Sequence, residues 1–158
     1  MRDECLRGIV MTNVLHHVPD PTAFFDEAWR CVRAGGVIAM IEPWHNRWAG
    51  WVYRHLHHEP FDPDAQAWRI DAGGPLSGAN GALPWIMFVR DRAMFTRRWP
   101  GWHIRSIDTM MPLRYLLSGG VSLRNAMPWG TDHLVAAVER LMPGLGLFAC
   151  IVLEKYDP

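Results

Sequence analysis

The sequence lacks the signals of several large classes of protein. Its 158 residues carry 16 lysines and arginines against 16 aspartates and glutamates, so no net charge favours nucleic acid or an acidic membrane surface. No apolar run approaches the roughly 18 residues of a membrane-spanning helix. The polar start, Met1-Arg2-Asp3-Glu4, is also unlike a signal peptide. We therefore predict a cytoplasmic protein with no nucleic-acid partner and no membrane span.

Cysteine is scarce as well. Cys5, Cys31 and Cys150 are odd in number, far apart in the sequence, and form no Cys-x-x-Cys pair. This spacing favours reduced thiols over a disulfide or a metal site. Internal repeats and low-complexity linkers are absent too, and the length suits one domain with a substantial core.

The clearest pattern is a strand, helix and strand over residues 8–43. Its first strand is predicted by an apolar run of the kind that is covered on both faces of a sheet: Ile9, Val10, Met11, Val14 and Leu15. Asp20 and Pro21 are typical of a helix start, and the pair Gly35-Gly36 predicts the end of that helix. Residues 37–41 then predict a second buried strand.

The remainder of the sequence predicts further helices and strands. Residues 44–59 have helical spacing, residues 60–84 are rich in turn signals, and Asp91 is a candidate cap for a short helix. Strands are predicted at 103–108 and 147–153, on either side of a helix after Thr131 whose apolar residues share one face. This alternation predicts an α/β layered domain.

Three motifs in this order resemble the class I S-adenosylmethionine-dependent methyltransferases of the type 11 kind. They are NVLHHVPDP at residues 13–21, RCVRAGG at 30–36 and IAMIEP at 38–43. In that family they belong to the fourth strand, the next helix and the fifth strand. The resemblance implies a partial Rossmann-like sheet with strands corresponding to 4-5-7-6, in which the final strand of the chain, residues 147–153, is inserted antiparallel. It also implies a helical and loop insertion between strands 5 and 6.

The resemblance divides a single domain, residues 1–158, into three parts. Residues 8–43 are the core unit, 44–102 the insertion that covers the substrate, and 103–155 the closing strands and helix. The family's glycine-rich cofactor loop and its acidic ribose ligand have no counterpart, since the only Gly-x-Gly, at residues 144–146, precedes a strand. We therefore expect an N-terminally truncated methyltransferase fragment for an unknown small-molecule acceptor, inactive alone and not binding S-adenosylmethionine by itself.

The exposed first strand of such a fragment predicts self-association. Two other functions remain open from the sequence. The chain is either a non-catalytic partner subunit that completes a sheet with another chain, or a metal-dependent hydrolase that uses its histidines and glutamates.

The resemblance also implies site residues. Thr12, Asn13 and Leu15 would line the cofactor, while His16 and His17 would lie at the mouth of the active site as catalytic residues. Histidine is the usual general base for an oxygen or nitrogen acceptor, and strand alternation would point only one of the two into the pocket. The alternative is a histidine that merely caps the strand end.

Substrate contacts are predicted at Glu42, His45, His58 and Trp85. Glu42 is either a substrate contact or a structural acceptor, and the tryptophans of the insertion either line an apolar or sugar-binding pocket or pack a small lid. His55 and His58 would share a helical face next to Glu59. No His-Glu-x-x-His frame is present, so no metal site is predicted.

Overall fold

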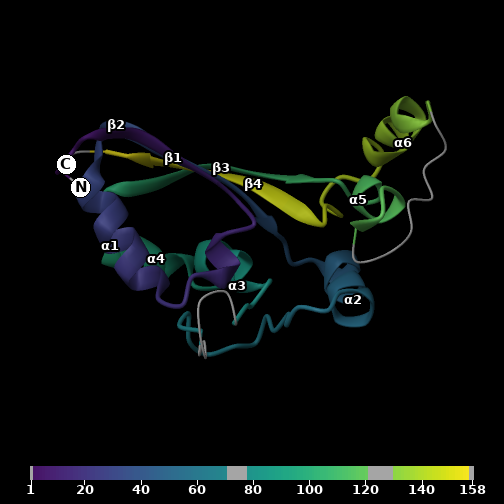
Figure 1. Ribbon diagram of the computed structural model, residues 1–158, viewed down its shortest axis with the longest axis horizontal. Helices are drawn as coiled ribbons and strands as arrows, with labels where there is room; N and C mark the ends of the chain where they lie inside the picture. Colours follow the sequence, from purple (N-terminus) through teal and green to yellow (C-terminus); the bar gives the residue numbers. More distant parts are fainter. Residues whose placement is uncertain (1, 71–77, 121–129, 157–158) are drawn as a thin grey trace.

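The computed structural model describes residues 2–70, 78–120 and 130–156, and shows an α/β fold built on one four-stranded sheet. Its strands lie in the order β1-β2-β4-β3 (Figure 1): β1 (Leu6–Thr12), β2 (Val32–Pro43), β3 (Trp102–Met110) and β4 (Phe148–Lys155). β1 is parallel to β2, whereas β4 is antiparallel to both β2 and β3. The predicted α/β class is confirmed, and the mixed sheet is compatible with a partial Rossmann-like methyltransferase.

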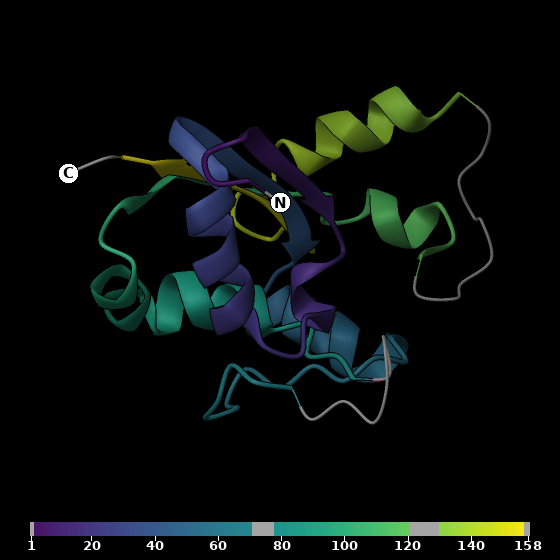
Figure 2. The ribbon, with the colours of Figure 1, turned by 60° about the vertical axis from the view of Figure 1, so that its left-hand side comes forward.

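Most of the helices lie on one face of this sheet (Figures 1 and 2). They are α1 (Pro21–Cys31), α2 (Arg47–Leu56), α3 (Leu83–Trp85), the π-helical turn η2 (Ile86–Arg90) and α4 (Arg92–Arg98). Beyond the strand ends lie α5 (Arg114–Leu117) and α6 (Asp132–Glu139). Among the described residues, no helix has the length and apolar character needed to cross a membrane.

The β1-α1-β2 unit follows the sequence signals at its start but not at its end. Asp20 caps α1 by accepting a hydrogen bond from the backbone N–H of Ala23, at 3.0 Å, as predicted. The helix ends at Cys31, before the double glycine, because Val32 already has an extended backbone and pairs with Leu6 of β1. The glycines instead lie within β2, where a Cβ on Gly36 would come within 2.9 Å of the Arg7 carbonyl oxygen.

The first strand begins and ends earlier in the sequence than predicted and is not covered on both faces. β1 ends at Thr12 because Asn13 has a left-handed backbone, with φ at 54°, so Val14 and Leu15 belong to the turn that follows. Val10 is 83% exposed. From residue 36 onward, β2 alternates between buried and half-buried side chains, which is the pattern of a sheet with one covered face.

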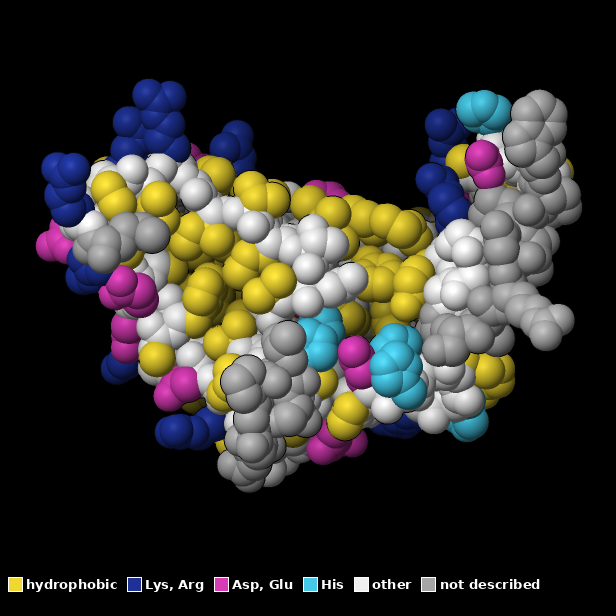
Figure 3. Space-filling view, in the orientation of Figure 1, with side chains coloured by type: hydrophobic (Ala, Val, Ile, Leu, Met, Phe, Trp, Pro, Cys, Tyr) yellow, Lys and Arg dark blue, Asp and Glu magenta, His cyan; other side chains and the backbone are white. Residues whose placement is uncertain are grey.

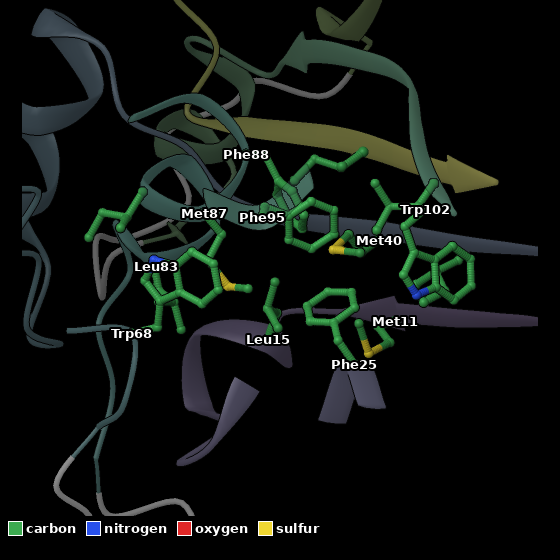
Figure 4. Packing of buried hydrophobic residues seen from close by; sticks show 14 of the residues in the cluster. Met11, Leu15, Phe25, Met40, Trp68, Leu83, Met87, Phe88, Phe95 and Trp102 are labelled. Carbon is green, nitrogen blue, oxygen red and sulfur yellow. The ribbon is translucent and has the colours of Figure 1, made fainter. Parts of the chain in front are cut away.

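The hydrophobic core fills the space between the sheet and the helices of its covered face (Figure 4). Phe25 of α1 lies at its centre, with edge-on ring contacts to Phe88 of η2 at 6.1 Å and to Phe95 of α4 at 5.2 Å between ring centroids. Leu15, in the turn after β1, and Met40, within β2, add aliphatic contacts. The strand-to-helix turn after β1 is therefore held by packing as well as by hydrogen bonds.

Two other helices differ from the sequence prediction. Asp91 does not cap α4 with its side chain, because its carboxylate binds Arg90 and the indole N–H of Trp68 instead. None of the residues of α6 is buried, and Leu134 on its predicted apolar face is 67% exposed.

Candidate functional site

The site begins in the turn that follows β1. The backbone N–H of Asn13 still donates to the carbonyl of Ile41 in β2, at 2.9 Å, and its left-handed conformation then redirects the chain. The next residues form a 3-10 turn, η1 (Leu15–His17), which places two adjacent histidines at the carboxyl ends of β1 and β2. In open α/β sheets this edge is where ligands bind.

Glu42 at the end of β2 holds this turn in place. Its Oε1 atom accepts hydrogen bonds from the backbone N–H groups of Val14, at 2.9 Å, and Leu15, at 2.8 Å. Its Oε2 atom lies 2.6 Å from Nδ1 of His16, and both side chains are almost fully buried. This contact fixes the orientation of the His16 ring, so Nε2 is the ring nitrogen that Glu42 does not engage.

A second carboxylate approaches from the segment after α2. Glu59 places one oxygen 3.6 Å from Nε2 of His16 and the other 3.6 Å from Nε2 of His17. His57 and His58 lie 3.9 Å and 4.0 Å from the same carboxylate. Figure 3 shows histidine side chains flanking an acidic group near the middle of this face.

A cavity of about 160 Å³ opens beside these groups, which at about 30 Å³ per water is room for roughly five water molecules. Its lining comes from the strand ends, from α2 and the segment after it, and from α5: Asn13, His16, His17, Pro43, Tyr53, His57, Glu59, Tyr115 and Phe148. A wider and more open groove of about 670 Å³ lies between β3 and α6, and no histidine lines it. The histidine-lined cavity is therefore the better candidate for chemistry.

Burial controls the protonation of two side chains in this cavity. It raises the pKa of Tyr53 well above its ordinary value, and the phenol donates a hydrogen bond to the Leu147 carbonyl at 2.7 Å. Burial also lowers the pKa of His57, which favours its neutral form. Tyr53 is thus a neutral wall of the cavity, anchored to the start of β4.

The structure brings together one part of the predicted site. Asn13, His16 and His17 line the cavity, and Glu42 lies directly behind His16. Thr12 is exposed at the end of β1, whereas Leu15 is fully buried in the hydrophobic core (Figure 4). The three residues predicted to line the cofactor, Thr12, Asn13 and Leu15, therefore face different environments.

The predicted substrate contacts are more dispersed. His45 packs against Trp85, at 4.6 Å between ring centroids, and its pKa is lowered by burial and by Arg54. His58 is 75% exposed at the rim of the Glu59 cluster. His55 and His58 do not share a helical face, because α2 ends at Leu56.

Sequence reasoning missed how the second carboxylate is used. Glu59 was considered with the histidines of its own segment, but it faces His16 and His17 from the turn after β1. The adjacent histidines and the His-His-Glu run were the only local signals, and neither indicates that the two segments meet. Tyr53, Tyr115 and Phe148 had no distinguishing signal at all.

The match to known families falls on the segment that carries this turn. Residues 1–40 match a family model described as a methyltransferase domain, a family that generally binds S-adenosylmethionine. The matched residues comprise β1, η1, α1 and most of β2. No curated protein matches the chain. The match covers about a quarter of the chain and is a likeness to the methyltransferase domain family within the β1-α1-β2 unit.

Proposed function

We propose that this chain is part of an S-adenosylmethionine-dependent methyltransferase that acts on a small-molecule acceptor. One observation carries the proposal. The segment that matches the methyltransferase family is the segment that places Asn13, His16 and His17 at the carboxyl edge of two parallel strands. The cavity at this edge would receive the acceptor.

The acceptor side of the reaction needs a group that can take a proton. Methyl transfer to a hydroxyl or amine releases one proton, and a positioned histidine is the usual general base. Glu42 fixes the imidazole of His16 through Nδ1, so Nε2 is the atom available toward the cavity. His17 would orient the acceptor from the adjacent wall.

The described residues do not form a complete cofactor site. Pockets that enclose a drug-sized ligand or a cofactor are usually about 300–1,000 Å³ in volume, whereas this cavity has a volume of about 160 Å³. We propose that Thr12 and Asn13 contribute one wall and that the other wall comes from a segment joined at β1. This interpretation is supported by the position of β1 at the edge of the described sheet and by the exposure of Val10.

Calorimetric titration of the purified chain with S-adenosylmethionine tests this proposal. We expect no binding in the micromolar range, because half of the crevice is absent from the described residues. Micromolar binding would contradict the incomplete-site proposal. Sequencing the DNA upstream of the Met1 codon provides the complementary test, since a strand followed by a glycine-rich turn encoded there would supply the other wall.

The same edge supports a second candidate function, that of a subunit that completes its sheet with another chain. The specific observation is the band of exposed hydrophobic side chains in Figure 3, over the part of the molecule where β1 crosses in Figure 1. Exposed strand edges are prone to pairing with other chains. Size-exclusion chromatography distinguishes the two candidates, because a well-folded monomer would argue against strand pairing between chains.

A further inference from the structure

We propose that His16, His17 and Glu59 bind one divalent transition-metal ion, with Zn²⁺ the ion that best fits these donors. Nε2 of each histidine lies 3.6 Å from an oxygen of Glu59, and the three donor atoms all lie within 4.8 Å of one another. Imidazole nitrogen and carboxylate oxygen are the donors of many zinc sites.

The distances between these donors suit a tetrahedral ion. Zinc binds nitrogen at about 2.0–2.1 Å and carboxylate oxygen at about 2.0–2.2 Å, which places neighbouring donors roughly 3.3 Å apart. The two distances of 3.6 Å, each to a different oxygen of Glu59, exceed this by a few tenths of an ångström. The three donors lie within 4.8 Å of one another, so binding would draw the most distant pair together by up to about 1.5 Å. The same 3.6 Å is too long for a hydrogen bond between the histidines and the carboxylate, so the gap between the donors leaves room for a bridging ion.

Both histidines have an oxygen acceptor on their other ring nitrogen. Nδ1 of His16 lies 2.6 Å from Glu42, and Nδ1 of His17 lies 3.4 Å from the backbone carbonyl of Gly78. Histidines that bind metals almost always donate their second N–H to a carboxylate or carbonyl, which fixes the ring and the tautomer. The structure thus presents the Nε2 atoms of two oriented imidazoles beside one carboxylate.

The charge around Glu59 favours a cation. In the described part of the chain, the ion pairs of this carboxylate are all with histidines, namely His16, His17, His57 and His58. No lysine or arginine among the described residues lies within ion-pair distance of it.

Three protein donors leave a fourth zinc position open, as in catalytic zinc sites. All three donors line the cavity, so we place the open position there. A hydroxyl bound to the ion would release its proton to water in the cavity more readily. This last step rests on the proposed function, whereas metal binding does not. An ion would occupy the Nε2 atom that otherwise acts as the base, so His16 would then act by holding the ion.

The sequence did not predict this site because its donors come from segments that are distant in the chain. The test uses the untagged full chain, stripped with a chelator and titrated with ZnCl₂ against a chromophoric competitor. We expect one equivalent to bind, and Co²⁺ to give the visible absorption of a tetrahedral site. His17→Ala and Glu59→Gln should each weaken zinc binding by about tenfold or more.

His55→Ala is the matched control. His55 is an exposed histidine of α2 whose Nδ1 lies 2.8 Å from the carbonyl of Trp51, so its removal should leave zinc affinity unchanged. If His17→Ala unfolds, Glu59→Gln decides the matter, because Glu59 lies outside the helices and strands. Failure of the wild-type chain to bind zinc, or equal affinity in the wild type and Glu59→Gln, would overturn the inference. Neither result depends on S-adenosylmethionine binding.

Discussion

The Nδ1 atom of His16 and the Oε2 atom of Glu42 lie 2.6 Å apart at the ends of two neighbouring parallel strands. The other oxygen of the same carboxylate accepts two backbone N–H groups of the turn. One buried side chain therefore determines both the backbone path after β1 and the orientation of an imidazole. Four predictions follow from this and other contacts.

Replacing Glu42 with alanine should destabilise the protein strongly. The change leaves two backbone N–H groups and His16 without their buried acceptor, a loss of about 3–5 kcal/mol in the free energy of unfolding. Glu154→Ala is the control, because the partner of Glu154, Arg105, is 65% exposed and such pairs contribute about 1 kcal/mol or less. Urea denaturation in the presence of a chelator measures both variants. Equal losses would show that Glu42 does not hold the turn.

Substitutions at two neighbouring positions of β1 should differ greatly in their effect on stability. Met11 is buried in the core, so Met11→Ala should cost about 2–5 kcal/mol. Val10→Thr should change stability by no more than about 0.5 kcal/mol, because that side chain is exposed. Denaturant unfolding at low protein concentration provides the comparison. A large loss at Val10 would mean that the outer face of β1 is covered in solution.

His45 should make folding sensitive to mild acid. Burial and Arg54 lower its pKa in the folded state, while Asp64 acts in the opposite direction. Between that lowered pKa and the ordinary value near 6.5, the unfolded chain binds more protons, so stability falls as the pH decreases below about 6.5. His45→Phe, which keeps an aromatic ring against Trp85 and Phe61, should flatten this dependence. If the free energy of unfolding of the variant depends on pH as steeply as that of the wild type, the acid sensitivity comes from other groups.

Lys155 should be important for stability although it is a charged residue. It is buried, and its ammonium group donates 2.8 Å hydrogen bonds to the carbonyls of Trp29 and Val32 at the end of α1. Lys155→Met removes two bonds to a charged donor and should cost about 1.5–3 kcal/mol. Arg105→Met, on the exposed side of β3, is the control. Thermal unfolding of the two variants should separate them by several degrees, and coincident transitions would refute the assignment.

Local signals in the sequence predicted the elements that local chemistry determines. Asp20 and Pro21 mark the start of α1 because capping depends on a hydrogen bond between residues that are only three positions apart in the sequence. The strands at 103–108 and 147–153 were predicted from alternation or apolar character, and both are present. The left-handed Asn13 was missed because the apolar residues after it continue the pattern of a strand.

The candidate site was predictable only where it follows a strand end. His16, His17 and Glu42 were identified because the resemblance assigns them to the carboxyl edge of the sheet. The approach of Glu59 to His16 depends on the path of α2 and the segment that follows it. That path is determined by packing against the core and the sheet, which no spacing of residues encodes.

The position of β4 also governs how the protein can be made. Although β4 is the last strand to be synthesised, it lies between β2 and β3 and pairs with both. Residues up to Lys155 must therefore have left the ribosome before β3 can pair with its only neighbour among the described strands. The pairing of β3 is thus delayed relative to that of β1 with β2, and its edge is exposed to chaperones in the meantime.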